Sequence, residues 1–334
     1  MTNGIYTLAN DVVCDQLIAL LNSIEVNLGS DFPVCVIPYD DRLEKVLPII
    51  ERRKNVSLLD NREILSRWED FSTKIWEVHP TAFKIWQERG VSGVNRLGMH
   101  RRFCAFDPES PFDRFVFLDA DILVLLSFDY IFEKLNEYDL VVYDFQYKDP
   151  SHVYDVNSSK LLEVFSQERI DSEIFCAGLY AAKKGVFPEE TREMLLKKLG
   201  DGEAEILYVN GPDQSIINYM TMRSPRSIYN FSLHLPPEEK TGCSVTSPHF
   251  EYRDKVLYDK GKRLTYLHYI GVPSKVFTQV CEGKNLDFPY REIFLHYRYL
   301  HEPEKRPLFS GKPKPYDAPP SLMSKVFKKL GLKS

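Results

Sequence analysis

Short apolar runs alternate with segments of helical periodicity in the N-terminal part of the chain. Residues 4–9 (GIYTLA), 32–39 (FPVCVIPY) and 56–60 (VSLLD) have the composition of strands. Between them, apolar residues recur every three or four positions in residues 17–24 and again in residues 42–53, which predicts two helices. This order predicts an α/β fold with a mainly parallel central sheet and helices on both faces. Ligands of such sheets bind beyond the carboxyl ends of the strands.

The same alternation continues to about residue 300. Further strands are predicted at residues 115–118, 139–145, 175–182 and 263–271, and helical segments at residues 61–114 and 213–220. From about residue 302 proline and lysine become frequent, and residues 321–334 contain four lysines and no acid. The sequence therefore predicts one domain over residues 1–300, followed over residues 301–334 by a Pro/Lys-rich linker and a basic amphipathic helix.

Two carboxylates stand in a strongly apolar run. Residues 115–128 read FVFLDADILVLLSF, with Asp119 and Asp121 near the middle. In an extended segment these side chains point to the same side, with their Cα atoms roughly 6.6 Å apart. An unpaired polar group in a dry interior costs about 2–7 kcal/mol, and a charge costs more. A divalent cation between them would remove that cost, and Mg²⁺ or Mn²⁺ would complete its shell with ligand phosphates. The alternative is that both aspartates cap a turn and face water.

Composition narrows the class of protein. The formal charge of the 334 residues is −5 and Lys and Arg are spread along the chain, so nucleic acid is not an expected partner. Six widely spaced cysteines without a C-x-x-C pair are typical of reduced thiols. The pattern of a secretory signal is missing, and no window has the roughly 18–20 apolar residues of a membrane span. We expect a cytoplasmic protein, with weak peripheral contact of residues 321–334 at the inner membrane face as a further hypothesis.

Six short motifs follow one another along most of the chain. They are TLAND at 7–11, RR at 101–102, FLDADILVL at 117–125, CAGLY at 176–180, GPDQSIIN at 211–218 and HYIG at 268–271. In this order they resemble the motifs of metal-dependent glycosyltransferases with the GT-A fold. The resemblance is strongest to family 8, which includes glycogenin and the bacterial lipooligosaccharide galactosyltransferases. It implies the GT-A fold and transfer of a sugar from a nucleotide-diphosphate donor.

The resemblance implies a role for each matched position. Asp119, Asp121 and His268 would hold the metal ion, and an imidazole beside two carboxylates shifts the preference from Mg²⁺ toward Mn²⁺. Asp213 would hold hydroxyls of the transferred sugar, and Gln214 would lie near the anomeric carbon as a polar stabiliser. Contacts with the donor are implied for both metal-binding aspartates and also for Leu8, Ala9, Asn10, Asp11, Arg101, Arg102, Ala120, Cys176, Ala177 and Gly178.

The alternative for His268 is a hydrogen-bonded core histidine on a strand. Gly271 and Lys275 favour the functional interpretation, because a glycine lets the backbone approach a diphosphate and a nearby lysine balances its charge. Arg101 and Arg102 point about 100° apart on a helix, so one of them is expected to reach the diphosphate.

The acids outside the D-x-D motif also have a simple structural explanation. Asp11, Asp40 and Asp213 each stand where a helix is predicted to begin, so each is a candidate N-cap. Asp40 is a weaker candidate for contact with the base or the ribose, and there the cap is preferred.

The chain departs from the family pattern in three places. The usual Asn-Ala-Gly is Cys-Ala-Gly at residues 176–178, and the usual H-x-x-G-x-x-K-P-W is HYIGVPSKVF at residues 268–277. The helical insert before the basic residues Arg96, Arg101 and Arg102 is also long. These departures concern the donor sugar and the diphosphate contacts and leave the metal site untouched.

We therefore expect a metal-dependent hexosyltransferase, with UDP-hexose as the preferred donor. The acceptor is a carbohydrate, a lipid-linked group or a protein that the sequence does not identify. The resemblance implies retention at the anomeric carbon, with the leaving phosphate accepting the acceptor's proton. One alternative is a catalytically inactive sugar-nucleotide-binding protein. Another is a D-x-D phosphatase, but the motif of that class has Thr or Val at the position that Leu123 occupies in this sequence.

Overall fold

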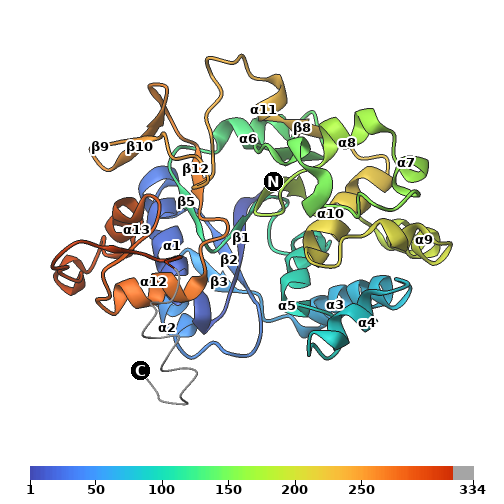
Figure 1. Cartoon of the computed structure of the whole chain (residues 1–334), viewed down its shortest axis with the longest axis horizontal. Coiled ribbons are helices and arrows are strands. Elements are labelled where there is room, and N and C mark those ends of the chain that lie inside the picture. Colours follow the sequence, from blue (N-terminus) through green and yellow to red (C-terminus); the bar gives the residue numbers. More distant parts are fainter. Residues whose placement is uncertain (319–334) are drawn as a thin grey trace.

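The computed structural model describes residues 1–318, and a seven-stranded sheet forms its centre (Figure 1). The strand order is β3-β2-β1-β4-β7-β6-β8, and in this sheet β7 alone runs against the others. The strands are β1 (Asn3–Ala9), β2 (Val34–Pro38), β3 (Val56–Leu58), β4 (Arg114–Asp119), β6 (Leu140–Val142), β7 (Leu179–Lys183) and β8 (Ile228–Asn230). The mainly parallel α/β sheet expected from the sequence is confirmed.

Helices cover both faces of this sheet because the side chains of each strand alternate between the faces. In β1, Ile5 and Ala9 join one apolar core, whereas Tyr6 and Leu8 join the other. The first core includes residues of α1 (Cys14–Leu28), α2 (Val46–Glu51), α6 (Asp129–Lys134) and α11 (Phe231–His234). The second core includes residues of α3 (Arg62–Glu77), α4 (Ala82–Glu88), the 3-10 helix η2 (Arg101–Phe106), α7 (Leu161–Val164), α8 (Gln167–Glu173), α9 (Glu189–Gly200) and α10 (Pro212–Arg223).

A third apolar core lies beyond the carboxyl end of β4. There β5 (Ile122–Val124) leaves the main sheet and pairs in antiparallel fashion with β12 (Tyr266–His268). This core also contains residues of β10 (Val256–Asp259), α12 (Ser274–Cys281) and α13 (Arg291–Arg298), and α13 packs against α1 (Figure 1). The long late strand predicted over residues 263–271 is thus short, and it belongs to this smaller sheet.

Several other predicted elements differ in their bounds. The helix predicted from residue 42 begins at Val46, because the preceding residues form a turn. The helical stretch predicted over residues 61–114 is interrupted, and it includes the single-turn helix α5 (Leu97–His100). Several elements described above had no sequence prediction of their own: β5, β8, β10, α6 to α9 and α11 to α13. The same holds for β9 (Glu251–Arg253), β11 (Lys262–Arg263), β13 (Leu286–Asp287), β14 (Lys314–Pro315) and the 3-10 helices η1 (Asp11–Val13), η3 (Gln146–Lys148), η4 (Pro150–His152), η5 (Glu203–Ile206) and η6 (Pro303–Lys305).

The described part of the C-terminal segment lies on the surface, where β14 pairs with β13. The boundary predicted at residue 300 stays a prediction, and the amphipathic helix predicted in residues 321–334 falls outside the described residues. Among the described residues, no helix combines the length and the apolar character needed to cross a bilayer.

Candidate active site

The D-x-D carboxylates lie where the chain leaves the central sheet. Asp119 is the last residue of β4, and Asp121 immediately precedes β5. In the pairing of β5 with β12, His268 is opposite Ile122, and the backbone N–H of Tyr269 donates to the Asp121 carbonyl at 3.0 Å. This pairing brings His268 beside the two acids although it lies far away in the sequence.

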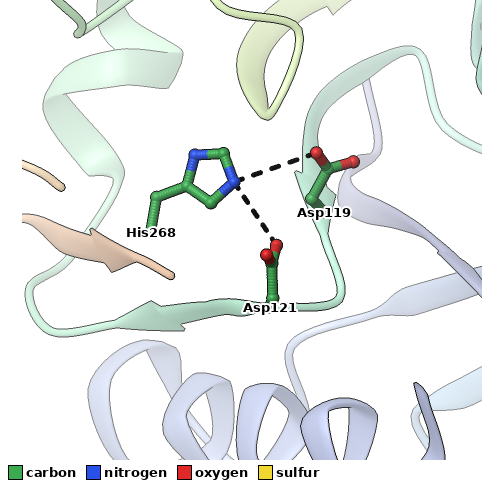
Figure 2. A group of neighbouring side chains, drawn as sticks. All are labelled: Asp119, Asp121 and His268. Atoms are coloured by element: carbon green, nitrogen blue, oxygen red, sulfur yellow. Dashed lines mark ion pairs between the residues drawn. The ribbon is translucent and has the colours of Figure 1, made fainter. Parts of the chain in front are cut away.

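The three side chains converge on one point (Figure 2). His268 Nε2 lies 3.4 Å from Asp121 Oδ1 and 4.0 Å from Asp119 Oδ2, and one ligand atom from each residue lies within 4.8 Å of the others. Burial by itself lowers the pKa of His268, but the neighbouring Asp121 carboxylate outweighs burial, so this pKa is raised well above its usual value. The cluster therefore attracts positive charge. Two carboxylate oxygens and an imidazole nitrogen are a donor set that suits a divalent cation.

Gly178 makes room for the histidine. A Cβ atom at this position would lie only 2.4 Å from His268 Cε1, so any larger residue would displace the imidazole ring. The Gly178 carbonyl also accepts a hydrogen bond of 2.9 Å from the backbone N–H of Asp119. The glycine of the CAGLY motif thus positions two members of the cluster.

A buried arginine joins the cluster to the sugar-facing acid predicted from the sequence. The Arg102 guanidinium lies 2.9 Å from Asp119 Oδ1 and 3.2 Å from Asp213 Oδ2, and it donates to the Ala177 carbonyl at 2.7 Å. Its carbon atom lies 4.8 Å from the centre of the Phe117 ring. Burial raises the pKa of Asp119, and the positive charge of Arg102 offsets only part of that increase. Burial also favours a higher pKa for Asp213, but Arg102 and His100 outweigh it, so that pKa is lowered.

Arg101 has a different environment from its neighbour. Its guanidinium contacts Glu69 at 2.5 Å and donates to the Pro38 carbonyl at 2.9 Å. Neither arginine of the pair is a free cation, because each is paired with acids of the chain itself. The expectation that one of them contacts a diphosphate stays a prediction.

A first cavity of about 320 Å³ opens between β1, the end of β2 and the D-x-D turn. Leu8, Ala9 and Asn10 line it, as do Asp119, Ala120 and Asp121 at its other end. Asn10 is held in place, since its Oδ1 accepts from the backbone N–H of Val12 at 3.0 Å and its Nδ2 donates to Asp40 at 2.9 Å. Two residues that sequence reasoning missed, Gln16 and Tyr39, also line this cavity.

Besides Arg101, three residues predicted to contact the donor do not line the cavities at the cluster. Asp11 Oδ1 accepts from the backbone N–H groups of Lys45 and Val46, so it caps α2. Asp40 supports Asn10 and pairs with Arg42, consistent with a structural role. Lys275 lies in the first turn of α12 and is not among the lining residues.

A second cavity of about 470 Å³ shares Asp119 and Asp121 with the first. Its lining brings together the remaining predicted site residues: Arg102, Cys176, Ala177, Gly178, Asp213, Gln214, His268 and Gly271. The amide of Gln214 is fixed at both ends, because its Oε1 accepts from Ala177 N–H at 3.1 Å and its Nε2 donates to the His152 carbonyl at 3.0 Å. Gln214 therefore forms a rigid polar wall of this cavity.

A third cavity of about 670 Å³ adjoins the second across Cys176 and His268, which line both. Asp144 lies in its wall with 4% of its surface exposed, and its Oδ2 has no hydrogen-bond partner among the described residues. Burial raises the pKa of Asp144 to about 7. Asp144 is an acid near the end of the apolar strand predicted over residues 139–145, which is the signal that could have identified it.

Comparison with known proteins gives a fold but no family. No protein-family model matches the chain, and no curated protein matches it. Among solved structures, the bifunctional glycosyltransferase WbbM in its apo form has a TM-score of 0.54 and 17% identity, covering 92% of this chain and 52% of WbbM. The galactosyltransferase LgtC, in complex with donor and acceptor sugar analogues, has a TM-score of 0.47 and 15% identity, with coverages of 83% and 94%. GlyE of Streptococcus pneumoniae TIGR4 has a TM-score of 0.45 and 15% identity, with coverages of 89% and 60%.

The chain spans about half the length of WbbM. This likeness confirms that the chain has the GT-A glycosyltransferase fold expected from its motifs. A fold does not determine an activity, so the activity has to be argued from the site.

Proposed function

We propose that this chain is a glycosyltransferase that takes its sugar from a nucleotide-diphosphate donor. The observation that carries the proposal is the position of Asp119 and Asp121, which line both the cavity of about 320 Å³ and the cavity of about 470 Å³. The order of groups in a nucleotide-sugar matches this arrangement, because its diphosphate lies between the nucleoside and the sugar. The nucleoside would occupy the first cavity, and the sugar would lie in the second beside Asp213 and Gln214.

Asp119, Asp121 and His268 would hold a divalent cation, with Mn²⁺ preferred because an imidazole joins the two carboxylates. When bound, this cation would act as a Lewis acid that stabilises negative charge on the departing diphosphate.

The chain's own residues would position the sugar. Arg102 holds Asp213 as a carboxylate inside a buried wall, where it accepts hydrogen bonds from sugar hydroxyls. Gln214 is a poor nucleophile and both ends of its amide are already used. It would limit the movement of the ring and stabilise positive charge at the anomeric carbon through its dipole.

We propose UDP-hexose as the donor and retention as the stereochemical outcome. In this reaction the bond from the anomeric carbon to the phosphate oxygen breaks, and a bond to the acceptor oxygen forms on the same face. The acceptor's proton passes to the leaving phosphate. The acceptor would approach through the third cavity, past Cys176. We place the reaction in the cytoplasm, which the six free, widely spaced cysteines support.

The contacts of Asp119 argue against a D-x-D phosphatase, whose first aspartate acts as a nucleophile. Asp119 Oδ1 lies 2.9 Å from the buried Arg102 guanidinium. A carboxylate oxygen held in such a pair is a weakened nucleophile. The same pair suits an acid that binds a cation and must keep its orientation.

The test is release of nucleoside diphosphate from UDP- and GDP-sugars by the full chain with Mn²⁺. Slow hydrolysis without an acceptor is expected for at least one donor, and Asp119→Asn should abolish it. Asp60→Asn is the matched control, because Asp60 is exposed and lines neither of the two cavities. Binding without release would instead identify a sugar-nucleotide-binding protein. Phosphate release from a simple phosphate ester would identify a phosphatase.

A further inference from the structure

The charges of the site do not balance when a diphosphate is added. The site contains three acids, Asp119, Asp121 and Asp213, and one buried guanidinium, that of Arg102, which pairs with Asp119 and Asp213. With a divalent cation bound, these groups sum to about zero net charge. A diphosphate then brings about two further negative charges, which the groups of the site leave uncompensated. A second cation of the chain is therefore required near the cluster.

Arg96 lies where this second cation is needed. It lines the first cavity and the second, at the junction that it shares with Asp119 and Asp121. Its charge also acts on Asp213, whose pKa it helps to lower. The diphosphate of a donor that occupies both cavities would have to pass this junction.

Arg96 also differs from the neighbouring arginines in being free. Arg42 pairs with Asp40, Arg101 with Glu69, and Arg102 with two acids. Within residues 1–318, Arg96 makes no ion pair, and its side chain makes no hydrogen bond. Its guanidinium keeps all its donors, which can pair with two phosphate oxygens at once.

The backbone holds Arg96 at this junction. Its φ of 56° and ψ of 39° lie in the left-handed region, which a residue with a Cβ adopts rarely and with strain. Buried Val94 anchors the chain before it, and the Arg96 carbonyl accepts from Met99 N–H at 2.8 Å as α5 begins. Strained backbone of this kind is frequent at ligand-binding positions, and here it occurs at the residue that lies at the junction of the two cavities.

We propose that Arg96 binds the diphosphate of the nucleotide donor and neutralises the leaving group. The inference rests on the proposed function, and it adds a contact to the one expected from Arg101 or Arg102. In transfer, the bond between the anomeric carbon and the phosphate oxygen breaks and its electron pair stays on the diphosphate. The charge that develops there faces Arg96, whose attraction grows as the bond breaks.

The test is calorimetric binding of UDP and of uridine, each with Mn²⁺, to the wild-type chain and to Arg96→Ala. The dissociation constant for UDP should rise about tenfold to a hundredfold in Arg96→Ala, the loss typical of a charged hydrogen-bonding group. Binding of uridine should stay within about twofold, because uridine has no phosphate. Arg96→Lys should recover part of the affinity for UDP, since it restores the charge without the planar fork.

Lys84→Ala is the matched control. Lys84 is an exposed cation of the nearby helix α4 that lines neither cavity, so its loss should leave UDP binding unchanged. Equal UDP affinity in Arg96→Ala and the wild-type chain would overturn the inference and leave the proposed function standing. An equal loss for uridine and UDP would overturn it too, because Arg96 would then shape the cavity. If the wild-type chain bound neither UDP nor, in the same experiment, GDP, both proposals would fail.

Discussion

Asp119 and Asp121 differ in how much each depends on a cation. Asp119 has Arg102 at 2.9 Å, whereas Asp121 faces His268 at 3.4 Å. Removing the charge of Asp121 therefore takes away the carboxylate ligand that has no arginine beside it. We expect Asp121→Asn to abolish metal-dependent binding of UDP in a calorimeter while leaving the fold unchanged by circular dichroism. Wild-type affinity in this variant would remove the metal assignment.

Gly178 gives a second prediction at the residue scale, because its lack of a side chain leaves room for His268. In Gly178→Ala the new methyl group would lie about 2.4 Å from His268 Cε1, so the imidazole must move away from Asp121. We expect the affinity for Mn²⁺ to fall about tenfold to a hundredfold, as when a group that orients a ligand is lost. Gly200→Ala is the control, since no atom lies within 4 Å of the position of its Cβ. Unchanged Mn²⁺ affinity in Gly178→Ala would mean that His268 is not a ligand.

His100 gives a prediction about pH and stability. It is buried beneath the site, it accepts a hydrogen bond from Trp76 Nε1 at 3.1 Å, and burial lowers its pKa to about 4. An unfolded histidine has a pKa of about 6.5, so between these values the unfolded chain binds a proton that the folded chain does not. The free energy of unfolding should therefore fall as pH drops from about 6.5 to about 4, by up to about 3 kcal/mol from this residue.

The comparison that isolates this effect uses His100→Gln, which keeps a side-chain acceptor near Trp76 and does not titrate. Urea unfolding of both proteins at several pH values between 7 and 4 measures the difference in unfolding free energy. As the pH falls from 7 to 4, the wild-type protein should lose more unfolding free energy than the variant does. A difference that is the same at every pH would contradict the prediction.

At the scale of elements, one side chain joins the CAGLY segment to α10. Asn218 Oδ1 accepts from the Phe175 N–H and its Nδ2 donates to the Phe175 carbonyl, both at 2.8 Å, so the amide takes the place of a neighbouring strand. Asn218→Ala leaves both buried backbone groups unpaired, which should reduce the unfolding free energy by about 2–4 kcal/mol. Asn157→Ala, at an exposed turn, should change it by less than about 0.5 kcal/mol. Equal stabilities in urea unfolding would show that this link is not needed.

Some elements of the site could be predicted from the sequence because their signals are local. The apolar run before Asp119 predicts β4, and the two acids follow directly from it. The departure of β5 from the main sheet has no such signal, because residues 122–125 simply continue the apolar run. The roles of Arg101 and Arg102 cannot be distinguished from the sequence either. They differ in their ion-pair partners, which are distant in the sequence: Glu69 for Arg101 and Asp213 for Arg102.

At the scale of the whole molecule, the order of strands and helices predicts an α/β fold because each parallel pair needs a crossover. The reversed direction of β7 leaves no mark on composition, since a strand buried on both faces is apolar in either direction. The meander β9–β11 was missed for a different reason. Its strands have only two to four residues and β9 is fully exposed, so no apolar alternation identifies them.

Residues 321–334 are predicted to bring the whole molecule to anionic membrane surfaces. This segment lies outside the described residues, and its four lysines and apolar positions predict a basic amphipathic helix. Four lysines near an anionic surface contribute about 1 kcal/mol each, so contact should be reversible and should weaken as salt is raised. We expect the full chain to cosediment with anionic vesicles at low salt and to remain in the supernatant with neutral vesicles. A chain ending at residue 320 keeps every described residue and should not sediment with either. Equal sedimentation of both chains would show that the tail is not the contact.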